Sequence, residues 1–179
     1  MAIEADLPLV EEILGSRRDQ IGEDYAGYRN HVYRMLNFCF ALHTCSEEER
    51  RKVTIAGCFH DIGIWTEATF DYLPPSIEAA ETYLMASGLD DWCPEIELMI
   101  DEHHKLRRFR DSLSPLVEVF RQGDLVDFSL GMVRCGLPKD LVKAVKERFP
   151  NEGFHKTVLR RELGWFWRHP LRPVPVAKW

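Results

Sequence analysis

Apolar residues recur at helical spacing along nearly the whole chain, and this periodicity constrains the fold more than any other feature. In residues 24–44 they return every three or four positions, which gathers them on one face of a helix. No segment alternates apolar and polar residues over the length of a strand, and the Asn-Gly signal of a tight hairpin is lacking. The sequence therefore predicts an all-α helical bundle of about seven or eight helices. The expected helices cover about residues 6–15, 24–44, 46–63, 76–87, 94–108, 114–130, 138–149 and 156–168.

Two local patterns set boundaries of these predicted helices. Ser46 and Glu49 have the spacing of a capping box, which predicts that a helix starts there. Pro74 and Pro75 disfavour helix and restrict the residue before them to extended geometry. We therefore expect residues 66–76 to form a loop.

No internal repeat, low-complexity tract or long linker divides the sequence, so we expect one domain over residues 1–179. Its last part, residues 131–179, should contain the C-terminal helices and a proline-rich tail. That tail, HPLRPVPVAKW, is too rich in proline for a helix and should run extended over the surface or across a partner subunit.

Charge and hydropathy exclude several classes of protein. The chain of 179 residues has 23 Lys and Arg against 29 Asp and Glu, a net charge of -6. This acidity argues against duplex nucleic acid as a partner. No stretch approaches the roughly 18 apolar residues of a membrane span, and the N-terminus lacks a basic region followed by an apolar one. We expect a cytoplasmic protein with no membrane partner.

The five cysteines argue against a disulfide framework. They are odd in number and include no CxxC pair, so a zinc site built from thiolates is not expected either. We expect them to act as small buried hydrophobic residues.

Several polar residues fall on faces that the helical pattern assigns to the core. They are His31, His60, Asp61, His103, His104 and Asp124. Each alone has an ordinary explanation, because a single histidine on an apolar face is more often a hydrogen-bonded core residue than a ligand. Together they are harder to bury, since an unpaired buried carboxylate costs several kcal/mol. A shared divalent metal ion would supply the compensating charge.

The side-chain chemistry of this set suits such an ion. Imidazole nitrogen and carboxylate oxygen bind borderline or hard first-row divalent metals without closing the coordination sphere as thiolates do. His60 and Asp61 would point about 100° apart in the middle of a helix. At a helix end just before Gly63 they can converge. A water on the metal would have its pKa lowered towards neutrality and become a nucleophile.

The order His31, His60-Asp61 within FHDIG, and Asp124 within RQGDLVD resembles the H...HD...D pattern of the HD-domain superfamily, over about residues 25–130. This resemblance implies an all-helical domain in which the four residues bind one divalent metal ion, which could be Mn, Co, Ni, Mg, Zn or Fe. It also implies a phosphohydrolase acting on a nucleotide or another small phosphoester. Asp61 would then orient or deprotonate the attacking water.

A second metal is possible through His103 or His104. Two-metal members of the superfamily have histidines in separate segments between the HD pair and the last aspartate, whereas here the two are adjacent, so one metal is expected. His103 or His104 would then hold a substrate oxygen or transfer a proton. Lys105, with Arg107 and Arg108, would neutralise a phosphate, although these cations could equally form a solvated helix end.

Further candidates lie near the motif. Glu67 follows the HD pair and could be a general acid or base, as in similar phosphohydrolases, or a plain surface glutamate. Tyr72 could stack on a substrate ring or pack a rigid loop. Asp127 could bind the metal or orient one of its ligands. Arg29 and Arg34 flank His31 and are weaker candidates for the site.

Three readings of function stay open at this level. The first is a metal-dependent hydrolase with a small phosphorylated substrate. The second is a di-iron oxygenase or hydratase on the same scaffold, and the third is a non-catalytic sensor or ligand-binding module. The aromatic segment with Trp165, Phe166, Trp167 and Trp179 is expected to form core or a subunit interface, which makes a homodimer plausible.

Overall fold

The computed structural model describes residues 2–67, 71–105, 107–110 and 114–168, and their side chains as far as Arg161. The predictions about the aromatic segment and the proline-rich tail therefore lie outside the described residues. Within the described ranges every regular element is a helix and no β-strand occurs, which confirms the all-α prediction.

The described part of the chain contains eight helices of eight or more residues. They are α1 (Pro8–Gly15), α3 (Tyr25–Leu42), α4 (Glu47–Phe59), α6 (Leu73–Ala86), α7 (Cys93–Glu102), α8 (Pro115–Phe128), α9 (Lys139–Arg148) and α10 (Phe154–Arg168). Four short turns of helix join them, namely α2 (Arg18–Ile21), η1 (Gly22–Asp24), α5 (Gly63–Thr66) and η2 (Asp90–Trp92).

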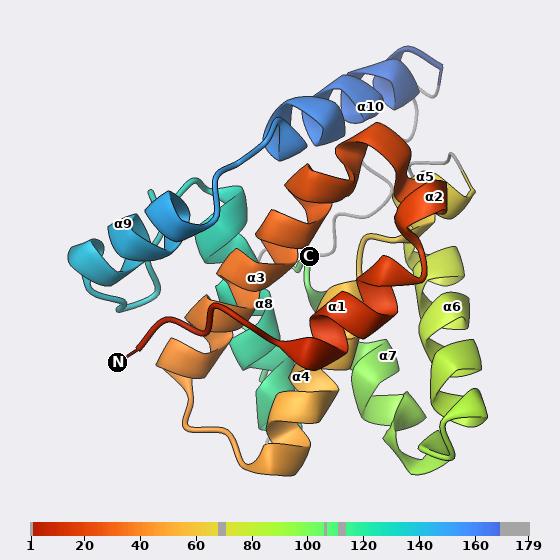
Figure 1. Cartoon of the computed structure of the whole chain (residues 1–179), viewed down its shortest axis with the longest axis horizontal. Coiled ribbons are helices and arrows are strands. Elements are labelled where there is room, and N and C mark those ends of the chain that lie inside the picture. The colour runs from red at the N-terminus through yellow and green to blue at the C-terminus, as the bar shows by residue number, and fades with distance from the viewer. Residues whose placement is uncertain (1, 68–70, 106, 111–113, 169–179) are drawn as a thin grey trace.

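The longest helix, α3, crosses the molecule and packs against α8 along much of its length (Figure 1). Helices α1, α4, α6 and α7 lie together on one side of this central pair, where α4 contacts α1, α6 and α7. Helices α9 and α10 lie on the other side, and both contact α3. Residues 31–40 of α3 are all buried, because neighbours cover this helix on every side.

A glycine on α8 sets the close approach of the central pair. A Cβ atom at Gly123 would lie only 2.3 Å from the Cys39 sulfur and 3.0 Å from the Met35 carbonyl oxygen of α3. Only a hydrogen fits there, so α8 can bring the neighbouring Asp124 against the middle of α3.

The capping box at the start of α4 is present as predicted. The Glu49 amide donates to the Ser46 hydroxyl, 3.3 Å, and the Ser46 amide donates to the Glu49 carboxylate, 2.7 Å. The helix ends at Phe59, with His60 as its C-cap, and the chain bends before α5 begins at Gly63.

Three predicted helix boundaries are wrong. Helix α4 ends at Phe59 and not just before Gly63. Helix α6 begins at Leu73, so residues 73–76 are helical and not a loop. Pro74 and Pro75 occupy its first turn, where a backbone N–H has no acceptor within the helix and a proline costs little. Helix α7 ends at Glu102 and not near residue 108, so Lys105 and the arginines after it follow the helix in irregular chain.

The cysteines are free, as the sequence predicts. Cys39 and Cys58 are buried, whereas Cys45, Cys93 and Cys135 are half-buried, which corrects the prediction that all five belong to the core. Among the described helices, none is both long and apolar enough to span a bilayer.

Candidate metal centre

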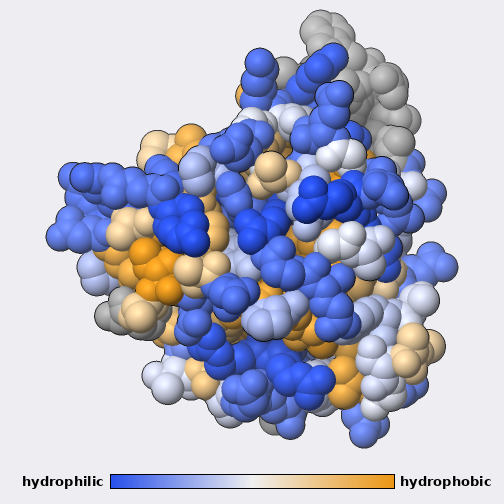
Figure 2. All heavy atoms as spheres, viewed as in Figure 1, coloured by the Kyte–Doolittle hydropathy of each residue, from blue (hydrophilic) through white to orange (hydrophobic). Residues whose placement is uncertain are grey.

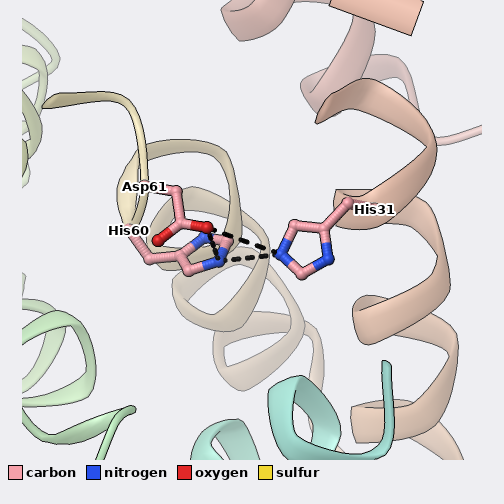
Figure 3. A group of neighbouring side chains, drawn as sticks. All are labelled: His31, His60 and Asp61. Carbon is pink, nitrogen blue, oxygen red and sulfur yellow. Dashed lines mark hydrogen bonds and ion pairs between the residues drawn. The ribbon is translucent and has the colours of Figure 1, made fainter. Parts of the chain in front are cut away.

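Five side chains with metal-binding chemistry meet where α3, α8 and the C-terminal ends of α4 and α7 converge. His31 comes from the middle of α3, Asp124 from α8, His60 from the C-cap of α4 and His103 from the C-cap of α7, and Asp61 follows His60. Each residue is at most 6% exposed. Helix α4 ends at Phe59, earlier than predicted, and the bend between it and Gly63 lets His60 and Asp61 converge on His31 (Figure 3).

The ligand atoms of His31, His60 and Asp61 lie close enough to share one ion, and Asp124 lies beside the two imidazoles. The Nε2 atoms of His31 and His60 are 3.0 Å apart, and Asp61 Oδ2 lies 3.8 Å and 3.3 Å from them. Asp124 Oδ1 lies 3.5 Å and 3.9 Å from the same two nitrogens. Metal–ligand bonds of about 2.1 Å separate neighbouring ligand atoms by about 3.0 Å in octahedral and about 3.4 Å in tetrahedral geometry.

Hydrogen bonds on the far side of each ring fix which nitrogen faces the cluster. Nδ1 of His60 lies 2.8 Å from the Gly57 carbonyl oxygen, and Nδ1 of His103 lies 2.7 Å from that of Ile100. Nδ1 of His31 lies 2.7 Å from a carboxylate oxygen of another residue of α8. Because carbonyl and carboxylate oxygens only accept, each ring in its neutral form would carry its proton on Nδ1 and turn the Nε2 lone pair inward.

Burial and charge set the protonation states at the centre of the cluster. Burial lowers the pKa of His60 to about 3, against the opposing effect of the Asp61 carboxylate. Burial alone would raise the pKa of Asp61, but the imidazoles of His60 and His103 outweigh it and hold that pKa well below its usual value. Burial raises the pKa of Asp124 to about 6, although His103 and His31 oppose the shift. A neutral His60 and an ionised Asp61 are the forms that bind metals.

The carboxylate behind His31 belongs to Asp127, one turn after Asp124. Its Oδ2 atom accepts from His31 Nδ1, and Arg34 donates to both of its oxygens over 2.5 Å and 2.8 Å. Arg34 Nη1 also donates to the carbonyl oxygens of Phe149 and Pro150, 3.1 Å and 3.2 Å away. Burial raises the pKa of Asp127, but His31 and Arg34 reverse the effect and keep that pKa far below its usual value.

This network settles the place of two candidates. Asp127 holds His31 from behind, in the orienting position predicted as one of its two options. Arg34 is 2% exposed and fully committed to this network, so it is not placed to meet a substrate. Arg29 turns away from the cluster and pairs with Glu11.

A second group of ligand atoms shares Asp61 with the first. One ligand atom each of Asp61, His103 and His104 lie within 4.8 Å of one another, as do those of Asp61, His31 and His60. Two overlapping groups could therefore hold metal ions. Asp61 Oδ1 and His103 Nε2, 3.6 Å apart, are buried atoms without a hydrogen-bond partner in the described part of the chain.

The hydroxyl of Tyr72 borders this second group. It lies 2.5 Å from His104 Nε2, and the residue is 2% exposed. Burial raises the pKa of Tyr72 well above its usual value, and the Asp61 carboxylate adds to the shift. Tyr72 therefore packs inside the protein, in agreement with the second of its two predicted options.

Aromatic rings that the sequence analysis missed enclose the first group. Phe154, the first residue of α10, stacks on His31 with ring centres 4.1 Å apart, and Phe120 meets the His60 ring edge-on. Tyr28 donates its hydroxyl to the Cys58 carbonyl oxygen, 3.0 Å away. Tyr28, one turn before His31, and Phe120, one turn before Asp124, carried a local signal, whereas Phe154 reaches the site from far along the chain.

Glu67 and Lys105 lie apart from the histidines. Glu67 is the exposed C-cap of α5 and borders a surface hollow with Pro74 and Glu78. Lys105 is half-buried and forms an ion pair with Glu102, N to O 2.7 Å. The structure gives neither side chain a contact with the metal-binding atoms. Arg107 and Arg108 are exposed.

Comparison of the chain with protein-family models, with curated proteins and with solved structures finds no match. The fold and the cluster define an all-helical domain with a buried site of histidines and aspartates that could hold a metal ion.

Proposed function

We propose that His31, His60, Asp61 and Asp124 bind a divalent metal ion and that the protein is a metal-dependent hydrolase. One observation carries the metal site. The Nε2 lone pairs of His31 and His60 face each other across 3.0 Å while their Nδ1 atoms are held by acceptors. Two lone pairs at that distance repel unless a proton or a metal ion lies between them, and oxygens of Asp61 and Asp124 lie 3.3–3.9 Å from the same two nitrogens, which favours a metal ion.

The chemistry of the donor set supports a reactive site over a purely structural one. Two imidazoles and two carboxylates leave coordination positions for water or substrate, unlike a closed site of four cysteines. A divalent ion held here would lower the pKa of a bound water and supply a nucleophile near neutral pH. The resemblance to the HD-domain superfamily, whose members are mostly phosphohydrolases, favours a small phosphoester as substrate.

The remaining polar residues take supporting roles in this proposal. The unpartnered His103 Nε2 atom, next to Asp61 Oδ1, would donate to or accept from a substrate oxygen or the attacking water. Half-buried His104 could pass a proton outward. Lys105 would have to leave its ion pair with Glu102 to bind a phosphate group. Glu67 is exposed and could contact only a bound substrate. Catalytic roles for these two residues therefore stay predictions.

The test combines metal analysis with a matched pair of variants. We expect about one divalent ion per purified chain, lost in Asp61→Ala and retained in Asp19→Ala, the change of an exposed aspartate in α2, with helical circular dichroism unchanged in both. The metal-loaded protein should hydrolyse members of a phosphoester and nucleotide panel, and Asp61→Ala should not. Full metal retention in Asp61→Ala would overturn the site. Metal binding without turnover of any panel member would overturn the hydrolase and favour a sensor module.

The second group around Asp61 favours a two-metal alternative. Asp61 belongs to two groups of possible ligands, one with His31 and His60 and the other with His103 and His104. A carboxylate that bridges two metal ions would occupy such a position. Two irons per chain with visible absorbance, reduced to one by His104→Ala, would support a di-iron oxygenase. A single non-iron metal unaffected by His104→Ala would exclude it.

A further inference from the structure

The side of the molecule formed by α9 carries two hollows that share a wall. The first, about 340 Å³, lies between α9 and the turn that follows α8, and its lining includes Arg134, Lys139 and Lys143. The second, about 460 Å³, lies between α9 and the start of α10. Leu130 and Lys146 line both, and Lys146 Nζ donates to the Leu130 carbonyl oxygen, 2.7 Å away. Hollows of this size accept small organic molecules.

Positive charge is concentrated around these hollows in a chain whose net charge is -6. Arg134 and Lys139 line the first hollow and Lys156 lines the second, and none of the three forms an ion pair with another described residue. The single acid among the lining residues of the first hollow is Glu147, which already faces Lys143 at 3.6 Å. Cations that lack partners on one surface raise the local concentration of anions.

Apolar surface and a buried charged pair accompany these cations. Val142 lies in the first hollow, and Phe149 in the second, where the Arg34–Asp127 pair also contributes to the lining. Figure 2 shows hydrophilic side chains over the end of the molecule where α9 lies, next to a hydrophobic patch. The combination suits a ligand that has both an anionic and an apolar part.

The turn that forms the outer wall is held close to α9. A Cβ atom at Gly131 would lie 2.8 Å from Val142 Cγ1, and Leu130 and Cys135 have φ angles of 55° and 47°. Such left-handed backbone at residues other than glycine persists where surrounding contacts fix it, so the wall has a defined position before any ligand arrives.

We propose that these two hollows form an anion site, separate from the candidate metal centre, for a small molecule with two or more phosphate groups and an apolar portion. The adjoining cations of the turn, α9 and α10 receive the phosphates, and the apolar walls receive the remainder. Asp127 lines the second hollow and holds His31, so the ligand lies directly behind the metal centre.

The test measures pyrophosphate binding by isothermal titration calorimetry to the full chain, freed of metal and kept without it. Without metal the result does not depend on the proposed hydrolase. We expect Lys139→Glu to weaken binding about tenfold and Arg160→Glu, an equal charge reversal on an exposed residue outside both hollows, to change it less than twofold. Orthophosphate should bind more weakly than pyrophosphate.

Lys139→Glu should weaken pyrophosphate binding without causing the protein to misfold. Lys139 is the first residue of α9, where an acidic side chain is favoured by the helix dipole, so the thermal midpoint should not fall. Equal weakening by both reversals would show a general charge effect and overturn the site. Loss of pyrophosphate binding in metal-free Asp61→Ala, with normal binding in Lys139→Glu, would also overturn the site. The absence of pyrophosphate binding to the wild-type chain would overturn it as well.

Discussion

The two sides of the His31–Asp61 cluster differ in how completely their polar atoms are bonded. On the Arg34 side, His31, Arg34 and Asp127 form a chain in which Nδ1 of His31, both carboxylate oxygens and all three guanidinium nitrogens have partners. On the Asp61 side, Asp61 Oδ1 and His103 Nε2 are buried 3.6 Å apart without a hydrogen bond among the described residues.

This difference separates the parts that build the site from the part that would react. A fully bonded buried network holds one arrangement, so the Arg34 side fixes the position and tautomer of His31. Buried polar atoms without partners are costly in a protein that gains nothing from them. The Asp61 side is therefore where a metal ion, a water or a substrate oxygen would complete the hydrogen bonding.

The largest effect on stability should come from breaking the bonded side. Arg34→Met leaves Asp127 and two backbone carbonyls without their main partner, and removal of one member of a buried ion pair costs about 3–5 kcal/mol. Asp61→Asn, on the other side, removes a charge that the neighbouring imidazoles stabilise but breaks no fully bonded network, so its cost to the metal-free protein should be smaller than that of Arg34→Met. Urea denaturation of both variants measures the contrast, and equal losses would show that the two sides do not differ.

A smaller effect is expected when only the orientation of His31 is disturbed. Asp127→Asn keeps the shape of the side chain but no longer holds the His31 ring by charge, so metal affinity should fall about 10–100-fold. Glu118→Gln is the matched control, because Glu118 pairs with Arg121 on the same helix α8 without touching a histidine. Competition with a chromophoric chelator measures both affinities. Equal affinities in the two variants would contradict an orienting role for Asp127.

The smallest effect is expected at the edge of the Asp61 side. Tyr72→Phe removes the hydroxyl next to His104 and should cost about 0.5–1.5 kcal/mol of stability. Tyr33→Phe removes a comparable hydroxyl that bonds Glu11, away from the cluster. Thermal unfolding should shift similarly in the two variants, whereas turnover by the metal-loaded protein should fall only in Tyr72→Phe. A fall of the same size in Tyr33→Phe would remove Tyr72 from the site.

Local sequence patterns predicted much of the fold and the centre of the candidate site. Apolar periodicity gave the helices, and polar residues on apolar faces identified His31, His60, Asp61 and Asp124, which the structure brings together. The start of α6 at Leu73 was predicted wrongly, because the effect of proline depends on its position in a helix. Proline breaks the middle of a helix but is tolerated in its first turn.

The contacts that hold the cluster in place had no local signal. Arg34 binds the carbonyl oxygens of Phe149 and Pro150, and Phe154 covers His31. The sequence around each of these residues contains no pattern that indicates its distant partner. The end of α7 was missed for a related reason, because His103 Nδ1 bonds the Ile100 carbonyl and so helps to close the helix. Side chains that donate to backbone carbonyls in place of backbone N–H groups leave no periodic trace in the sequence.

The bonds of Arg34 also set an order in which the protein can assemble. Its acceptors lie 93 residues further along the chain at Asp127 and 116 residues further at Pro150. During synthesis α3 emerges long before these acceptors do, so for that time a helix destined for the interior has a guanidinium and an imidazole without partners. Contacts that are so distant in sequence form slowly. We expect the arrangement around His31 to be completed late in folding, after α8 and the residues that follow α9 have docked.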